Sequence, residues 1–209
     1  MSTIEILLNA FTTLLVTLDP PGLAPIFLGL TRGMTRSQRK QVALRGSVIA
    51  FCILSVFAIF GASILGGLGI SIGAFRIAGG LMLFAIAFEM IFEKRNERKE
   101  KTSEDAITKD HVHNIAVFPL ALPLIAGPGA ISATMLLAAS LPGPIERAEL
   151  LLVIALSVGV VLAALMIAHK MERLLGMSGR AILTRLLGVI LAALSVQFVL
   201  DGIKAAFHI

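Results

Sequence analysis

The stretch LVTLDPPGLAPIF, residues 15–27, places an aspartate, two adjacent prolines and a glycine in the middle of a long apolar run. The run covers residues 5–30, which exceeds the roughly 20 residues that a helix needs to cross a bilayer. Proline removes a backbone donor and clashes with the preceding helical turn. Pro20 and Pro21 therefore predict a membrane-spanning helix that is broken near mid-membrane.

A second stretch, PLALPLIAGPGAI at residues 119–131, has the same character and lies inside another apolar run. Pro119, Pro123 and the Gly127–Gly129 triplet predict a second broken helix. Unpaired backbone groups are costly in lipid, so such breaks are tolerated only where they are buried in protein or line a wet cavity. Paired interruptions in corresponding spans indicate a transporter binding site.

The composition of the whole chain is typical of a membrane protein. Its 209 residues are 57% hydrophobic and 15% charged, whereas a soluble domain is about 45–50% apolar and about 25% charged. We expect an all-α membrane protein with six transmembrane helices. They are Glu5–Leu30, Gly46–Gly67, Ile72–Phe92, Ile115–Ser140, Glu149–His169 and Ile182–Gly202.

The basic residues predict the orientation of these helices. All Lys and Arg residues except Arg76, Arg147 and Lys204 fall in or beside three alternate connections. The positive-inside rule places these connections in the cytoplasm of a bacterial cell and both termini on the periplasmic side of the inner membrane. The longest of them, residues 93–114, mixes both signs of charge, and we interpret it as a solvated cytoplasmic loop.

The two halves of this single membrane domain resemble one another. The letters TLDPPG at residues 17–22 can be laid on LIAGPG at 124–129. Three spans per half is an odd number, so the second half must lie upside down relative to the first, as in many transporters. We predict two inverted three-helix repeats, residues 1–92 and 115–209, with the first and fourth helices broken.

Each break begins a new half-helix, whose first amides lack partners and whose dipole is positive. Gly22–Ala24 and Gly129–Ile131 could present these donors to a carboxylate, and the carbonyls before each break could hold a cation or an ammonium group. Two opposed helix ends would suit a zwitterionic amino acid. The predicted substrate-binding residues are Asp19, Pro20, Pro21, Gly22, Gly127, Pro128, Gly129 and Ala130. The alternative is a pair of proline kinks that only shape packing.

Asp19 is the only acidic residue near mid-membrane. A charge there costs about 2.5–3.5 kcal/mol on insertion scales, so it calls for a reason. Asp19 could bind a substrate ammonium, take up a coupling proton, or cap the half-helix that follows.

Other polar residues are candidates for lining a cavity. Asn9, Thr13 and Thr17 are spaced four residues apart, which places them on one face of the helix that leads to Asp19. They could line an aqueous path, or they could bond to neighbouring helices. Ser132, Ser195 and Gln197 lie near the centres of their spans and are further cavity candidates.

The two proline-containing stretches resemble those of the MarC family of integral membrane proteins, which is also described as a family of neutral amino acid transporters. The resemblance rests on residues 18–27 and 119–131 and extends over the whole chain in length, span number and motif order. It implies a six-span inner-membrane protein and transport of glycine, alanine or serine.

The leading hypothesis is a secondary transporter that works by alternating access, with its site between the two breaks. No P-loop of the form G-x-x-x-x-G-K-[ST] is present, so we expect the energy to come from a coupling proton or sodium ion or from the substrate's own gradient. We expect no enzymatic activity, no cofactor, no metal and no nucleic-acid partner. A non-transporting scaffold or accessory subunit and an exporter of other metabolites are the alternatives, and the sequence leaves oligomer formation open.

Overall fold

The computed structural model describes residues 3–95, 98–99, 115–141 and 143–207, and every regular element in that part of the chain is helical. This confirms the all-α class. The elements are α1 (Thr3–Leu18), α2 (Pro20–Leu30), α3 (Arg36–Gly67), α4 (Ile72–Ile91), η1 (Ala116–Ile125), α6 (Pro128–Ser140), α7 (Pro144–Met166) and α8 (Ala168–Phe207).

The helices account for the six predicted membrane spans. Among the described residues, five helices are long and apolar enough to cross a membrane, with α1 and α2 counted together as Glu5–Leu30. The sixth span is the pair η1 and α6, which are bent by 58° at the break between them. The predicted break in the fourth span is therefore confirmed, and the first span is interrupted between α1 and α2 at Asp19, whose φ is 55°.

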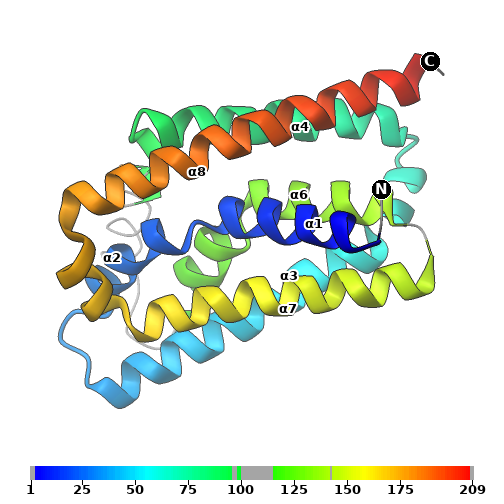
Figure 1. Ribbon diagram of the computed structural model, residues 1–209. Coiled ribbons are helices and arrows are strands. Elements are labelled where there is room, and N and C mark those ends of the chain that lie inside the picture. The colour runs from blue at the N-terminus through cyan, green and yellow to red at the C-terminus, as the bar shows by residue number, and fades with distance from the viewer. Residues whose placement is uncertain (1–2, 96–97, 100–114, 142, 208–209) are drawn as a thin grey trace.

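The spans form three layers (Figure 1). The broken helices α1–α2 and η1–α6 lie in the middle, α3 and α7 cover one side, and α4 and α8 cover the other. In the most apolar part of the first span 78% of the residues are buried, against at most 44% in the other four unbent spans. The unbroken helices thus shield the irregular backbone of the first break from lipid, as a bilayer requires.

The order and direction of the helices agree with two inverted halves. Corresponding helices run in opposite directions, and both chain ends lie at the same end of the bundle (Figure 1). The packing partners are also exchanged between halves, because α3 contacts η1 and α6 while α7 contacts α1 and α2. The internal repeat itself stays a prediction.

Local capping explains where two of the outer helices begin. Thr35 and Gln38 form a capping box at the start of α3, in which the Gln38 amide donates to Thr35 Oγ1 at 3.3 Å and the Thr35 amide donates to Gln38 Oε1 at 2.9 Å. Ser71 caps α4 by accepting a hydrogen bond from the Ala74 amide at 3.1 Å.

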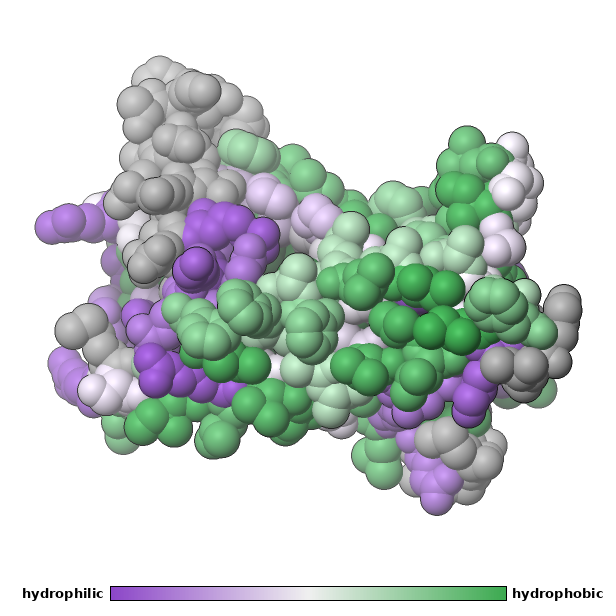
Figure 2. All heavy atoms as spheres, turned by 90° about the horizontal axis from the view of Figure 1, so that it is seen from above, coloured by the Kyte–Doolittle hydropathy of each residue, from purple (hydrophilic) through white to green (hydrophobic). Residues whose placement is uncertain are grey.

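The connection before the last span differs from a simple loop. Helix α8 begins at Ala168, and a change of direction occurs at Gly176, whose φ of +58° suits glycine. The basic end of the bundle is made up of this segment, the turn before α3, residues 92–95, and residues 98 and 99. Figure 2 shows an apolar belt across the middle of one face, with hydrophilic side chains gathered toward the ends.

Candidate functional site

Asp19 forms the first break. Its backbone is left-handed, with φ 55° and ψ 65°, so α1 ends at Leu18 and α2 begins at Pro20. Its carboxylate Oδ1 accepts a hydrogen bond from the Gly22 amide at 3.2 Å, and the residue is 0% exposed. The carboxylate therefore caps α2, which is one of the three roles that the sequence left open.

The two prolines after Asp19 decide which backbone groups stay unpaired. In a continuous helix the amides of residues 20 and 21 would donate to the carbonyls of Val16 and Thr17, but proline has no N–H. The Gly22 amide bonds the Asp19 side chain, and the Leu23 amide bonds the Asp19 carbonyl at 3.1 Å. The first break thus offers acceptors at the end of α1. The expectation of free donors at Gly22 and Leu23 is wrong.

The second break is longer than a single kink. Inside η1 the backbone is extended at Phe118 and at Leu122, and the peptide bonds to Pro119 and Pro123 are cis. The amides that follow bond five residues back, as from Ala126 to the Ala121 carbonyl at 2.8 Å. Prolines four residues apart therefore extend the irregular backbone through most of η1.

The start of α6 has the opposite character to the start of α2. Gly127 is its N-cap and provides no side-chain hydrogen bond, and Pro128 has no N–H. Within the described part of the chain, the amides of Gly129 and Ala130 have no hydrogen-bond partner. The expected free donor at Ile131 is wrong, because its amide donates to the Gly127 carbonyl at 3.0 Å. The second break thus offers donors at Gly129 and Ala130, at the positive end of a helix dipole.

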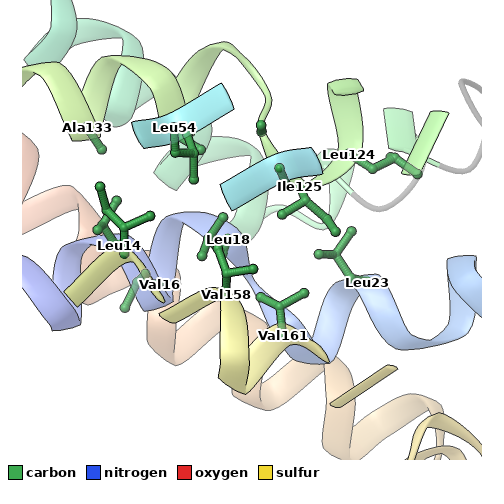
Figure 3. Close-up of a cluster of buried hydrophobic side chains, with 14 of the residues drawn as sticks. Leu14, Val16, Leu18, Leu23, Leu54, Leu124, Ile125, Ala133, Val158 and Val161 are labelled. Carbon is green, nitrogen blue, oxygen red and sulfur yellow. The ribbon is translucent and has the colours of Figure 1, made fainter. Parts of the chain in front are cut away.

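The two breaks lie against each other. Thr17 Cγ2 is 3.6 Å from the position that a β-carbon on Gly129 would take. On one side, apolar residues of the breaks, including Leu18, Leu23 and Ile125, pack with Val158 and Val161 of α7 (Figure 3). This packing holds the two breaks side by side.

On the other side the breaks border a cavity of about 440 Å³. The cavity walls come from α1, α4, η1, the start of α6 and the segment after α4. The lining residues are Thr17, Met82, Ala85, Ile86, Glu89, Arg95, Arg98, Lys99, Pro123, Leu124, Ile125, Gly127, Pro128, Gly129 and Ala130.

Two cations from the segment after α4 hold the acceptors of the first break. The Arg95 guanidinium donates to the Thr17 carbonyl and, at 2.9 Å, to Met90 Sδ. Lys99 Nζ lies 3.5 Å from Asp19 Oδ2. Arg95 is 6% and Lys99 7% exposed. The interpretation of residues 93–114 as a solvated loop is therefore wrong for these two side chains, and most of that loop lies outside the described residues.

Arg98 and Glu89 complete the charged wall of the cavity. Arg98 pairs with Glu89 Oε1 at 3.0 Å, while Glu89 Oε2 and Arg95 Nε are buried atoms with no partner in the described structure. The pKa of Lys99 is lowered to about 7: burial has the largest effect, the positive charge of Arg95 also lowers the pKa, and Asp19 opposes both effects. Burial also lowers the pKa of Arg95, but a guanidinium keeps its charge in proteins.

The predicted site residues divide into those that line the cavity and those that shape it. Gly127, Pro128, Gly129 and Ala130 line it directly. The other predicted residues form the first break and do not line the cavity. They are Asp19, Pro20, Pro21 and Gly22, and all four are buried.

The polar face of α1 leads to the cavity through successive hydrogen bonds. Thr13 Oγ1 donates to Asn9 Oδ1 at 3.1 Å, and Thr17 Oγ1 donates to the Thr13 carbonyl at 2.6 Å. Of the three residues, Thr17 is the one that lines the cavity.

The later cavity candidates are more scattered. Ser132 donates to Met82 Sδ at 3.4 Å, directly behind the cavity wall. Ser195 donates to the Leu191 carbonyl within α8, and exposed Gln197 donates to Asp201 at 2.8 Å. Ser195 and Gln197 are not among the residues that line the cavity.

Comparisons with known proteins identify the family of this chain. The model of the MarC family integral membrane proteins matches residues 4–207. A UPF0056 membrane protein of Archaeoglobus fulgidus is 38% identical over 93% of this chain and 90% of its own length. The UPF0056 membrane protein YvbG of Bacillus subtilis is 32% identical over 97% of this chain and 96% of its own. No solved structure matches. The chain therefore belongs to the MarC family of multi-pass integral membrane proteins.

Proposed function

We propose that this protein is a secondary transporter of small neutral amino acids, such as glycine, alanine and serine, in the bacterial inner membrane, with both termini on the periplasmic side. The substrate binds between the two breaks. The two three-helix halves then rock about the site, so that the cavity faces each side of the membrane in turn. A proton or a sodium ion supplies the coupling.

The observation that carries this proposal is the opposite polarity of two breaks beside one cavity. The amides of Gly129 and Ala130 form a donor end, and the Asp19 carboxylate with the Thr17 carbonyl forms an acceptor end. An α-amino acid carries a carboxylate and an ammonium on one carbon atom and can bridge two such ends. A cavity of about 440 Å³ lies at the lower end of the roughly 300–1,000 Å³ typical of ligand sites.

Uptake into proteoliposomes tests the proposal. We expect saturable uptake or exchange of labelled glycine and alanine. Asp19→Asn should lower the rate at limiting substrate by about tenfold to a hundredfold, because a hydrogen bond to a charged group contributes about 1.5–3 kcal/mol. Asparagine still caps a helix as well as aspartate does, so the fold should survive the change.

Asp201→Asn is the matched control. It makes the same chemical change in an exposed pair with Gln197, away from the cavity, and should leave uptake unchanged. Absence of saturable uptake of any small amino acid by the unmodified protein would favour a non-transporting scaffold. Uptake of other metabolites alone would keep the mechanism and reject the substrate class.

A further inference from the structure

Two acceptors of the first break, the Thr17 carbonyl and the Asp19 carboxylate, are held by cations of the chain itself. The carbonyl of Thr17 is free because Pro21 has no N–H, and the guanidinium of Arg95 takes it. The second carboxylate oxygen of Asp19 is not used in capping, and the ammonium of Lys99 takes it at 3.5 Å. The end of the site that suits a solute's ammonium is therefore already held in this conformation.

We propose that Lys99 is an internal stand-in for the cationic end of the solute: an arriving primary ammonium replaces Lys99 on Asp19, and Arg95 stays on the Thr17 carbonyl. This inference rests on the proposed function and adds the residue that competes with the substrate. The ammonium of lysine and that of an amino acid are the same chemical group, so one carboxylate can hold either but not both at the same oxygen.

The surroundings of the two cations give them different roles. Arg95 bonds Thr17 and also Met90 of α4, so it is held from two elements. Lys99 has one salt-bridge partner among the described residues, and its side chain forms part of the cavity wall. Lys99 is thus the cation that can leave with the smallest loss of contacts.

Two solutes of similar size distinguish binding at the ammonium end of the site from binding at the carboxylate end. Glycine carries the carboxylate and the ammonium, whereas propionate carries the carboxylate alone. Replacing Lys99 with methionine removes the competitor and keeps a side chain of similar length.

The apparent affinity for glycine is proportional to the fraction of protein whose site is free of the competitor. Lys99→Met should therefore tighten glycine binding by about tenfold or more. Lys99→Arg keeps a competing cation and should bind glycine no more tightly than the unmodified protein. Propionate binding should change little in either variant.

A chemical measurement keeps the proposal testable if the variant folds poorly. The reactivity of Lys99 toward acetic anhydride, read by mass spectrometry on the purified unmodified protein, should be low and should rise several-fold when glycine saturates the site. Asp19→Asn should raise it without glycine. Lys40, an exposed lysine, should label at a constant rate throughout.

The outcomes separate this inference from the proposed function. Glycine uptake with Lys99 labelling unchanged by glycine would overturn the inference and leave transport intact. Lys99 labelling that is fast from the start and indifferent to Asp19→Asn would also overturn it. If the proposed function is wrong, no uptake is observed, while the reactivity of Lys99 toward acetic anhydride stays low and still rises in Asp19→Asn.

Discussion

Lys99 is a residue whose charge depends on where its side chain lies. Inside the bundle its pKa is about 7, whereas in water it takes its ordinary value of 10.5. The groups that face it are Asp19 at the first break, Glu89 on α4, and Arg95 and Arg98 on its own segment. The residues of η1 and α6 that line the cavity are uncharged.

The sign of the pH effect follows from linkage. Rising pH favours the state that binds fewer protons, and between pH 7 and 10.5 that state is the inserted one, because inserted Lys99 is neutral while released Lys99 is charged. Below pH 7 both states are protonated and pH has no further effect. A solute that releases Lys99 above pH 7 must therefore be bound together with a proton.

Glycine binding should accordingly weaken as pH rises above 7. We expect a constant Kd below about pH 7 and a rise that approaches tenfold per pH unit toward pH 8.5, with proton uptake approaching one per glycine. Titration calorimetry in two buffers with different protonation enthalpies measures that uptake. Lys99→Met should bind glycine without this dependence. Binding that tightens with pH in the unmodified protein would contradict the linkage.

At the scale of elements, α4 and α8 pack backbone to backbone. A β-carbon on Gly80 would lie 2.8 Å from the Ser195 carbonyl oxygen and 3.1 Å from the Val199 nitrogen. Small residues allow such close approach between membrane helices. This contact also explains the position of Ser195, which belongs to a helix interface and not to the cavity.

Gly80→Ala should therefore destabilise the protein, by about 1–3 kcal/mol as is usual for overpacking, because the added methyl group meets backbone that cannot rotate away. Gly159→Ala is the control, since among the described residues no atom beyond its own stretch of helix lies within 4 Å of its β-carbon position. It should be neutral or stabilising by up to about 1 kcal/mol from helix propensity. Thermal unfolding followed by circular dichroism suits a chain without Trp or Tyr. Equal melting temperatures for the two variants would contradict tight α4–α8 packing.

The spans and the breaks could be predicted from sequence because their causes are local. Apolar runs give the spans, and prolines interrupt the backbone within one turn of themselves. The placement of Arg95 and Lys99 could not be predicted from sequence, because Lys99 and Asp19 are 80 residues apart. One signal did exist: a carboxylate at mid-membrane calls for a named partner. The sequence does not say which of several nearby cations in the loop that partner is.

At the scale of the whole molecule, one end carries most of the basic residues. The turn before α3, the segment after α4 and the start of α8 meet there, and both chain ends lie at the opposite end (Figure 1). These three connections lie at the same end because of the order and direction of the helices, whatever charges they carry. Charge then decides which end faces the cytoplasm.

The orientation can be tested with one cysteine at each end of the bundle. The native cysteine, Cys52, is exposed on α3 and can be replaced by alanine. Ser37, in the first turn of α3, and Ala148, near the start of α7, are both exposed. In intact cells a membrane-impermeant maleimide should label Ala148→Cys and not Ser37→Cys, and everted vesicles should reverse the pattern. Labelling of both from one side would contradict a span between them, and the opposite pattern would place Lys99 and the basic end outside the cytoplasm. The expected pattern would instead place the basic end of the bundle, with Lys99, on the cytoplasmic side.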